Sequence, residues 1–212
     1  MEKGPPPNLA SQKDIMETAY PVSLDAELDP NLSRWLWLVK WFLAIPHYIV
    51  IIFLWIAFAV LTVVAFFAIL FTGKYPRGIF DFNVGVLRWT WRVGFYSFSA
   101  LGTDRYPPFS LKVEDYPARF DVEYPERLSR GLVLVKWLLG IPHYIVVGIL
   151  QGGSYGGLND VIVIFAAIAL LFTGRYPASL FDLVMGFNRW AFRVIAYASL
   201  MRDEYPPFRF SP

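Results

Sequence analysis

Residues 20–50 read YPVSLDAELDPNLSRWLWLVKWFLAIPHYIV, and residues 116–146 read YPARFDVEYPERLSRGLVLVKWLLGIPHYIV. The two stretches align without gaps and are identical at 19 of 31 positions. Repetition of this kind indicates that one structural unit is present twice. We therefore expect two units that form a pseudo-two-fold pair and bury a shared surface, so that neither half is stable alone.

The repetition continues to the end of the chain. Residues 71–96 match residues 172–197 at 13 of 26 positions. Each half then closes with the tetrapeptide Tyr-Pro-Pro-Phe, at residues 106–109 and again at residues 205–208. The whole chain after its first residues is thus a tandem duplication.

The duplication divides the chain into three parts. Residues 1–19 are polar and rich in proline, without the apolar core of a signal peptide, and we expect them to be a disordered cytoplasmic leader. Residues 20–115 form the first membrane repeat and residues 116–212 the second. The offset between matched positions grows from 96 to 101 because of extra residues around the glycine-rich segment 151–159, so the two halves are not equal.

The composition favours a membrane protein. Apolar residues make up 56% of the 212 residues, aromatic residues 18% and charged residues only 17%, and the mean hydropathy is +0.44. Soluble domains carry about 25% charged residues. The absence of cysteine excludes disulfides, thiolate nucleophiles and cysteine-ligated metal centres. A net charge of +2 does not favour binding to nucleic acid.

The longest apolar stretch, residues 35–72, sets the expected topology. As one helix it would measure about 57 Å, against about 30 Å for the hydrocarbon core of a bilayer. We therefore expect a transmembrane hairpin of two spans here, with the glycine-rich segment marking the equivalent hairpin loop in the second repeat. An alternative is one span over residues 47–72 and a second over residues 79–101.

Charge orients the expected spans. Under the hairpin arrangement the lysine and arginine residues that flank the apolar stretches gather on one side, which the positive-inside rule assigns to the cytoplasm. We therefore expect a multi-pass protein of the bacterial cytoplasmic (inner) membrane with a cytoplasmic N-terminus. Both arrangements have an even number of spans per repeat, which predicts repeats related by an axis along the membrane normal.

Short stretches outside the apolar segments alternate between apolar and polar residues, which is typical of half-buried strands. They are residues 22–28, 109–114, 118–124 and 208–210. We expect residues 109–114 and 118–124 to form a hairpin. By symmetry, residues 208–210 would pair with residues 22–28, and the resulting small cytoplasmic sheet would hold the repeats together.

Ionisable residues near the apolar stretches are the first candidate site, because such residues at membrane depth are often functional. Spacings of four and seven place them on one helix face in both repeats. The two sets are Lys40, Ala44 and His47, and Lys136, Gly140 and His143. One hypothesis is that His47 and His143, the only two histidines, ligate one haem b between the repeats. The favoured interpretation is structural: each histidine hydrogen-bonds a neighbouring group, and no cofactor is bound.

A charged stripe along an otherwise apolar helix is the second candidate site. It recurs at spacings of four, seven and eleven residues in each repeat. Its members are Asp81, Gly85, Arg88 and Arg92, and Asp182, Gly186, Arg189 and Arg193. Structural ion pairs, such as Asp81 with Arg88 or with Lys40, are the favoured interpretation. The alternative is that Arg88 and Arg92 bind lipid phosphates.

The ordered motifs of both repeats resemble a known family. The string K-W-x-L-x-I-P-H-Y-I-V, then F-T-G-[K/R]-Y-P, F-D, R-W and Y-P-P-F, occurs twice between residues 20 and 210. It resembles the bacterial membrane family catalogued as domain of unknown function four-three-eight-nine. The resemblance implies a small integral membrane protein built from two tandem copies. Because no activity is assigned to that family, it carries over no functional residues.

No motif for nucleotide binding, serine hydrolase or metalloprotease chemistry is present. We therefore expect no enzymatic activity. The leading hypothesis is an accessory or scaffold subunit that packs against lipids and larger membrane proteins, since the aromatic surface is too large for a four-span protein to bury internally. The alternatives are a small lipid- or solute-handling protein and, less favoured, a haem-binding subunit.

Overall fold

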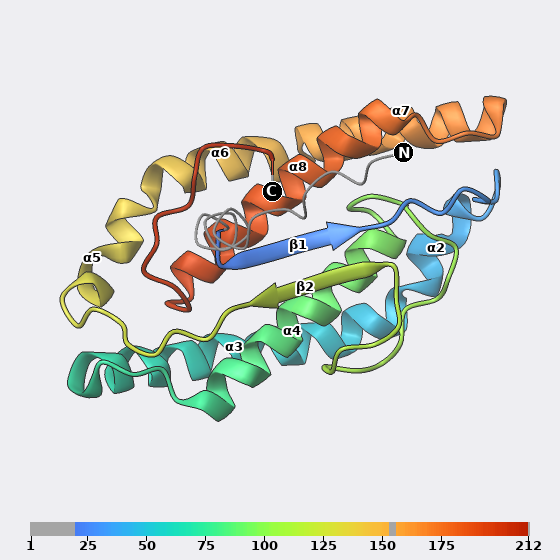
Figure 1. The fold of residues 1–212 in the computed structure, drawn as a ribbon. Coiled ribbons are helices and arrows are strands. Elements are labelled where there is room, and N and C mark those ends of the chain that lie inside the picture. The colour runs from blue at the N-terminus through green and yellow to red at the C-terminus, as the bar shows by residue number, and fades with distance from the viewer. Residues whose placement is uncertain (1–19, 153–155, 212) are drawn as a thin grey trace, which may run out of the picture.

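The computed structural model describes residues 20–152 and 156–211, which form a mainly helical structure with one small sheet (Figure 1). In chain order the elements are β1 (Val22–Ala26), α2 (Trp37–Leu43), α3 (Ile45–Thr72), α4 (Arg77–Tyr96), β2 (Ala118–Val122), α5 (Leu132–Leu139), α6 (Ile141–Gln151), α7 (Leu158–Thr173) and α8 (Ala178–Ala198). The expected leader, residues 1–19, lies outside the described residues.

These elements pack in three layers. The first is the sheet of β1 and β2, and the second is the pair α4 and α8, which support the sheet (Figure 1). The third layer, here called the outer layer, consists of α2, α3, α5, α6 and α7. Within it α3 packs on α4, and α6 and α7 pack on α8. The middle helices are therefore the most deeply buried ones.

The sheet is antiparallel, and its register reveals the symmetry of the molecule. Leu24 lies opposite Phe120, which is the same position in the other repeat, 96 residues later. A two-fold axis that relates antiparallel strands runs perpendicular to the sheet. The pseudo-two-fold axis therefore passes through the Leu24–Phe120 pair and perpendicular to all three layers.

The expected strand pairing was wrong. β1 pairs with β2, whereas residues 109–114 and 208–210 form no strand in the described chain. The reason lies in the Tyr-Pro-Pro-Phe segments, because the ring of Phe109 stacks on His47 and the ring of Phe208 stacks on His143. These contacts hold Phe109 and Phe208 against the histidines of α3 and α6, and neither residue is part of a strand.

The expected transmembrane hairpin within residues 35–72 was also wrong. α3 is a single helix of 28 residues, and it ends where Gly73 adopts a left-handed conformation with φ of 72°. Between His47 and Thr72 the sequence has neither glycine nor proline, so nothing favours a turn there. The antiparallel pair of this repeat is α3 with α4, which is close to the alternative division at residues 47–72 and 79–101.

The second repeat reaches the same arrangement with an interrupted helix. α6 and α7 both pack on α8, so together they take the place of α3. The glycine-rich segment lies between them, and a Cβ atom added to Gly152 would stand only 1.9 Å from the backbone nitrogen of Gly157. This close approach, which only glycine permits, brings the start of α7 back beside the end of α6.

Elements of each repeat pack on helices of the other repeat. β1, which precedes the first repeat's helices, packs on α8, whereas β2 packs on α4. α5 packs on α3, and α2 faces α7. The core is continuous across the junction, where the rings of Trp91 and Phe192 lie 5.7 Å apart. The prediction of two repeats that share a buried surface fits this exchange.

Candidate functional site

The outer layer exposes an extended apolar surface. α3 contains no aspartate, glutamate, lysine or arginine, and one of its faces exposes apolar side chains along its whole length. Phe53 is 67% exposed and Ile56 is 58% exposed, although both lie in the middle of the helix. The other large, exposed side chains of α3 are Ile45, Ile49, Val50, Ile52, Val60, Val63, Val64, Phe67 and Phe71. Such a surface is the first candidate functional site.

The remaining helices of the outer layer extend this surface. Their exposed apolar side chains are Leu38, Val39, Trp41, Phe42 and Leu43 of α2, Leu134, Val135, Trp137, Leu138 and Leu139 of α5, Ile141, Tyr144, Ile145 and Ile149 of α6, and Leu158, Val161, Ile164, Phe165, Ile168 and Phe172 of α7. Soluble monomers rarely expose a contiguous apolar patch of more than a few hundred Å². The outer layer is therefore a surface that needs a partner.

Among the described residues, α3 is the one helix that is both long and apolar enough to cross a membrane. α5 and α6 meet the same criterion only if they are taken together, and they are bent by 44° where they join. Two such candidates are weak support for membrane association. They do not by themselves support the multi-pass arrangement expected from the sequence.

Basic residues mark both ends of the outer layer. The guanidinium of Arg130 lies close to Gly73 at the end of α3, and that of Arg34 lies close to Gly174 at the end of α7. A positive charge there complements the negative end of a helix dipole. Exposed Lys74 and Arg175 follow the same two glycines, so each end carries two cations.

A buried lysine anchors the first helix of each repeat. Lys40 is 1% exposed, and its Nζ lies 2.8 Å from the Asp104 carboxylate and donates to the Thr103 carbonyl at 2.6 Å. Lys136 is likewise 1% exposed, and its Nζ lies 2.7 Å from the Asp203 carboxylate. The hypothesis that Lys40 pairs with Asp81 was wrong.

The two aspartates also accept hydrogen bonds from the backbone. Each buried lysine, its aspartate and the bound backbone groups are here called a lysine centre. Asp104 accepts a hydrogen bond from the Ser33 amide at 2.6 Å, and Asp203 accepts one from the Ser129 amide at 2.7 Å. Sequence reasoning missed both carboxylates. A signal was present, because each stands two residues before its Tyr-Pro-Pro-Phe segment.

Each histidine lies in an aromatic cage. The Nδ1 atom of His47 accepts a hydrogen bond from the indole of Trp89 at 3.1 Å, and the imidazole stacks on Phe109 with ring centroids 3.8 Å apart. The equivalent cage around His143 uses Trp190, at 3.0 Å, and Phe208, at 4.2 Å.

The two cages are separate. Among the described residues, the aromatic neighbours of His47 and those of His143 have no member in common. A phenylalanine covers one face of each ring, and Nδ1 is already engaged by a tryptophan. The structure therefore does not bring His47 and His143 together, and the cages do not fit one haem shared between them. Nor do the described residues hold a cluster of three His, Asp or Glu side chains that could bind a metal ion.

The charged stripe faces the sheet and the tail segments. Arg88 pairs with Asp121 at 2.9 Å and donates to the carbonyl of Phe120 at 3.1 Å. Arg189 makes the equivalent contacts, with Asp25 at 3.5 Å and the Leu24 carbonyl at 3.1 Å. The expected pair of Arg88 with Asp81 was wrong.

Asp81 and Asp182 stand apart from the arginines of the stripe. Asp81 forms an exposed ion pair with Arg77 at 3.1 Å, and Asp182 is exposed. The stripe arginines Arg88 and Arg189 thus pair with carboxylates of the strands, Asp121 and Asp25, and not with Asp81 and Asp182.

The deeper arginines, Arg92 and Arg193, are almost fully buried. Arg92 donates to the Ser110 carbonyl, and Arg193 lies over the Tyr20 ring at 5.3 Å. Burial, together with the positive charges of Arg189 and others nearby, lowers the pKa of Arg193 to about 10, so it stays protonated at neutral pH. All four arginines thus tie strands or tail segments to α4 and α8.

The glycines of the stripe make room for the tail segments. A Cβ atom on Gly85 would lie 2.9 Å from Leu111, and one on Gly186 would lie 2.7 Å from Phe210. Leu111 and Phe210 occupy the same position after their Tyr-Pro-Pro-Phe segments. In each repeat, the stripe is therefore the surface on which the tail segment packs against α4 or α8.

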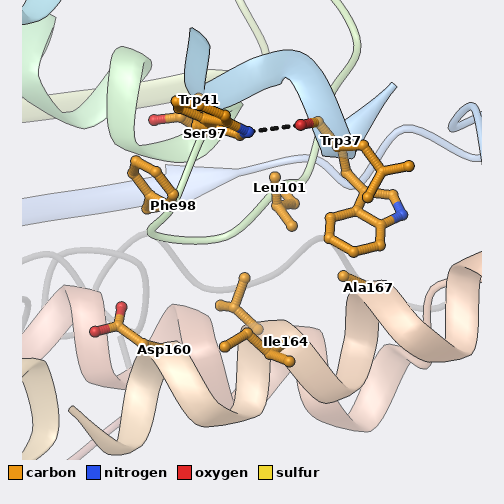
Figure 2. Close-up of a pocket in the computed structure, with 10 residues that line it drawn as sticks. Trp37, Trp41, Ser97, Phe98, Leu101, Asp160, Ile164 and Ala167 are labelled. Carbon is orange, nitrogen blue, oxygen red and sulfur yellow. Dashed lines mark hydrogen bonds between the residues drawn. The ribbon is translucent and has the colours of Figure 1, made fainter. Parts of the chain in front are cut away.

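Two apolar grooves open on the outer layer where the repeats exchange helices. Figure 2 shows the first, a cavity of about 250 Å³ in which Trp37 and Trp41 of α2 face Ile164 and Ala167 of α7. Asp160 lies at one end of it. The second, of about 380 Å³, lies between α3 and α5 and is lined by Val63, Phe67 and Trp137, among others. Sequence reasoning missed both grooves, because they exist only where distant segments meet.

A family model matches the chain in both repeats. The model of the family described as Domain of unknown function (DUF4389) matches residues 34–110 and residues 130–209, which together make up more than half of the chain. No curated protein and no solved structure matches. The matched segments fall one in each repeat, as the resemblance implied. The chain therefore belongs to the DUF4389 family and carries two tandem copies of its domain.

Proposed function

We propose that this protein is a non-catalytic scaffold that binds the bacterial cytoplasmic membrane through its outer layer, with its polar face toward the cytoplasm and its N-terminus on that side. One observation carries the proposal: the apolar surface of the outer layer, in which even mid-helix side chains such as Phe53 and Ile56 are more than half exposed. The opposite face, which the sheet and the tail segments form, would receive other subunits of a membrane complex.

The partner of the outer layer is a lipid bilayer in this proposal. Moving one large apolar side chain out of water contributes about 1.5–3 kcal/mol, and the outer layer has many of them. The cations at its ends, Lys74 with Arg130 and Arg34 with Arg175, suit the phosphates of anionic lipids. Exposed Trp35, Phe71 and Phe172 near these ends suit the polar boundary of a bilayer.

The polar side chains support a role without catalysis. Lys40 and Lys136 are held in closed ion pairs, and the stripe arginines bind carbonyls and carboxylates of the same chain. A general acid or base needs access to a reacting group. Side chains whose polar atoms already bind groups of the same chain do not have this access.

Flotation with liposomes tests the proposal. The protein is expected to float with vesicles that contain phosphatidylglycerol. Changing Phe53, Ile56 and Val60 of α3 to serine should reduce its partition at least about tenfold, because three exposed apolar side chains are lost. A control with Glu27, Arg119 and Glu114 changed to serine, all exposed on the polar face, should float as the unaltered chain does. Equal flotation of the two triple variants would contradict binding through the outer layer.

Extraction in mild detergent tests the scaffold role. Native mass spectrometry should show the chain within a larger assembly. A mass of 24.3 kDa, or a simple multiple with only lipid attached, would overturn the scaffold role while leaving membrane binding intact.

The two grooves favour a second candidate function, the handling of lipids. Both open onto the outer layer, so an acyl chain could enter from the bilayer without crossing water. If so, native mass spectrometry should show phospholipid retained on the protein. Ile164→Trp, at the mouth of the first groove, should reduce this retention severalfold, because the larger side chain blocks entry. Val161→Trp, which is also exposed on α7, serves as the matched control, and equal retention in both variants would argue against an acyl chain in this groove.

A further inference from the structure

We infer that the protein lies within one leaflet of the bilayer, with the helices of the outer layer parallel to the membrane plane and the sheet facing water. This inference rests on the proposed binding of the outer layer to a bilayer and adds its orientation. It replaces the multi-pass arrangement that hydropathy alone predicts.

The first reason is that the two faces of the molecule differ over its whole extent. The outer layer exposes apolar side chains along its whole length, with cations at its two ends. The sheet face carries exposed ion pairs, such as Arg119 with Glu27 at 3.1 Å, and the exposed carboxylates of Asp25 and Asp121. Hydrocarbon suits one face and water suits the other, which describes a body at an interface.

The second reason is that the sheet runs along the helices. β2 follows α4, because the ring of Tyr124 lies 5.0 Å from that of Phe80 while the Phe120 carbonyl binds Arg88, eight residues farther along the helix. Those eight residues correspond to about 12 Å along the helix axis. If α3 and α4 crossed the bilayer, the sheet would have to cross with them.

A sheet of two strands cannot cross a bilayer in this way. Both outer edges of β1 and β2 are unpaired with any other described strand, and open sheet edges are not tolerated in hydrocarbon because each unpaired backbone group costs several kcal/mol. The charges on Arg88 and Asp121 would enter the hydrocarbon as well. A spanning orientation would thus bury the most polar layer of the molecule in lipid.

The third reason is the direction of the pseudo-two-fold axis. Because it is perpendicular to the layers, it places the α3–α4 and α7–α8 connections at opposite ends of the molecule (Figure 1). Spanning helices would then put Lys74 and Arg175 on opposite sides of the membrane. With the helices in the plane, the axis lies along the membrane normal and both cationic ends meet the same layer of headgroups.

Dimensions agree with this orientation. A helix of 28 residues is about 42 Å long, which exceeds the hydrocarbon core of about 30 Å. In the membrane plane the length of α3 has no such limit. A helix with its side chains is about 10–12 Å thick, close to the depth of about 5–10 Å that interfacial helices reach.

Single cysteines provide the test, because the chain has no cysteine of its own. Lys74→Cys, Arg175→Cys and Glu27→Cys place one thiol at each end and one on the sheet face, all at exposed positions. Each variant is treated with a membrane-impermeant maleimide in sealed membrane vesicles of known sidedness. All three are expected to react from the same side, to at least about 80% of the labelling obtained in detergent. Reaction of Lys74→Cys and Arg175→Cys from opposite sides would overturn the inference.

Ile56→Cys, in the middle of the apolar surface, is the matched control. It is expected to stay unlabelled from either side until detergent is added, and labelling in intact vesicles would also overturn the inference. Flotation of every variant separates the two proposals. A chain that does not float, or that forms a soluble dimer through its outer layer, contradicts the proposed function and this inference together. A chain that floats but shows opposite sidedness contradicts the orientation alone.

Discussion

Replacing Lys40 with methionine is expected to lower the free energy of unfolding by about 3–5 kcal/mol, because one partner of a buried ion pair is lost. The lysine side chain is 2% exposed and that of Asp104 is 22% exposed, so water reaches the remaining carboxylate poorly. The carbonyl of Thr103 would also lose its donor. Thermal or denaturant unfolding in mild detergent measures the change. By symmetry, Lys136→Met should have a similar effect through Asp203.

Two further variants separate the ion pair from a general loss of charge. Arg77→Gln removes a cation whose side chain is 65% exposed, so the loss should be at most about 1 kcal/mol. The double variant Lys40→Met with Asp104→Leu should recover part of the loss, since no unpaired charge is then left buried. If Arg77→Gln and Lys40→Met are equally destabilising, the lysine centre is not a structural anchor.

A chain that begins at Asn31 and so lacks β1 should be destabilised by about 5 kcal/mol or more, which approaches the whole stability of many domains. Val22 and Leu24 are at most 2% exposed, and each contributes about 1.5–3 kcal/mol by burial. The deletion also removes the carbonyl and the carboxylate that bind Arg189. It would leave β2 with no strand to pair with in the described chain. Loss of a cooperative unfolding transition is the expected observation.

The matched control is a chain that begins at Tyr20 and keeps β1. The chain that begins at Asn31 should unfold with a clearly lower midpoint than this control. Because β1 belongs to the first repeat but packs on α8, the deletion should also destabilise the second repeat. Hydrogen exchange at Arg189 and its neighbours can detect that effect. If exchange increases only in the first repeat, the exchange of elements between repeats does not contribute to stability.

The sequence predicted the duplication, and with it the equivalence of the two lysines, the two histidines and the two stripes. It did not predict the residues that these side chains contact. Lys40 pairs with Asp104, which follows it by 64 residues, and Arg189 binds a strand that begins 167 residues earlier. Periodicity places residues on one face of an element but does not say which other element covers that face.

The topology was mispredicted for a related reason. Limiting the apolar stretch to the thickness of a bilayer assumes that its helices stand along the membrane normal, and that assumption produced a hairpin where α3 is unbroken. The strand pairing failed because alternation indicates a strand but not its neighbour. Residues 109–114 and 208–210 alternate as β1 and β2 do, yet Phe109 and Phe208 stack on the imidazole rings of His47 and His143, and these residues form no strand in the described chain.

The Leu24–Phe120 pair on the pseudo-two-fold axis has a consequence for the ancestry of the chain. In an ancestor with one repeat, the same fold would form from two identical chains, and a residue on the axis would meet its own copy. Every mutation there would then change both sides of the contact at once. After fusion into one chain, a leucine can face a phenylalanine, and one half can gain five residues between α6 and α7 while the other keeps an unbroken helix. Gene fusion thus released each half from the need to match the other.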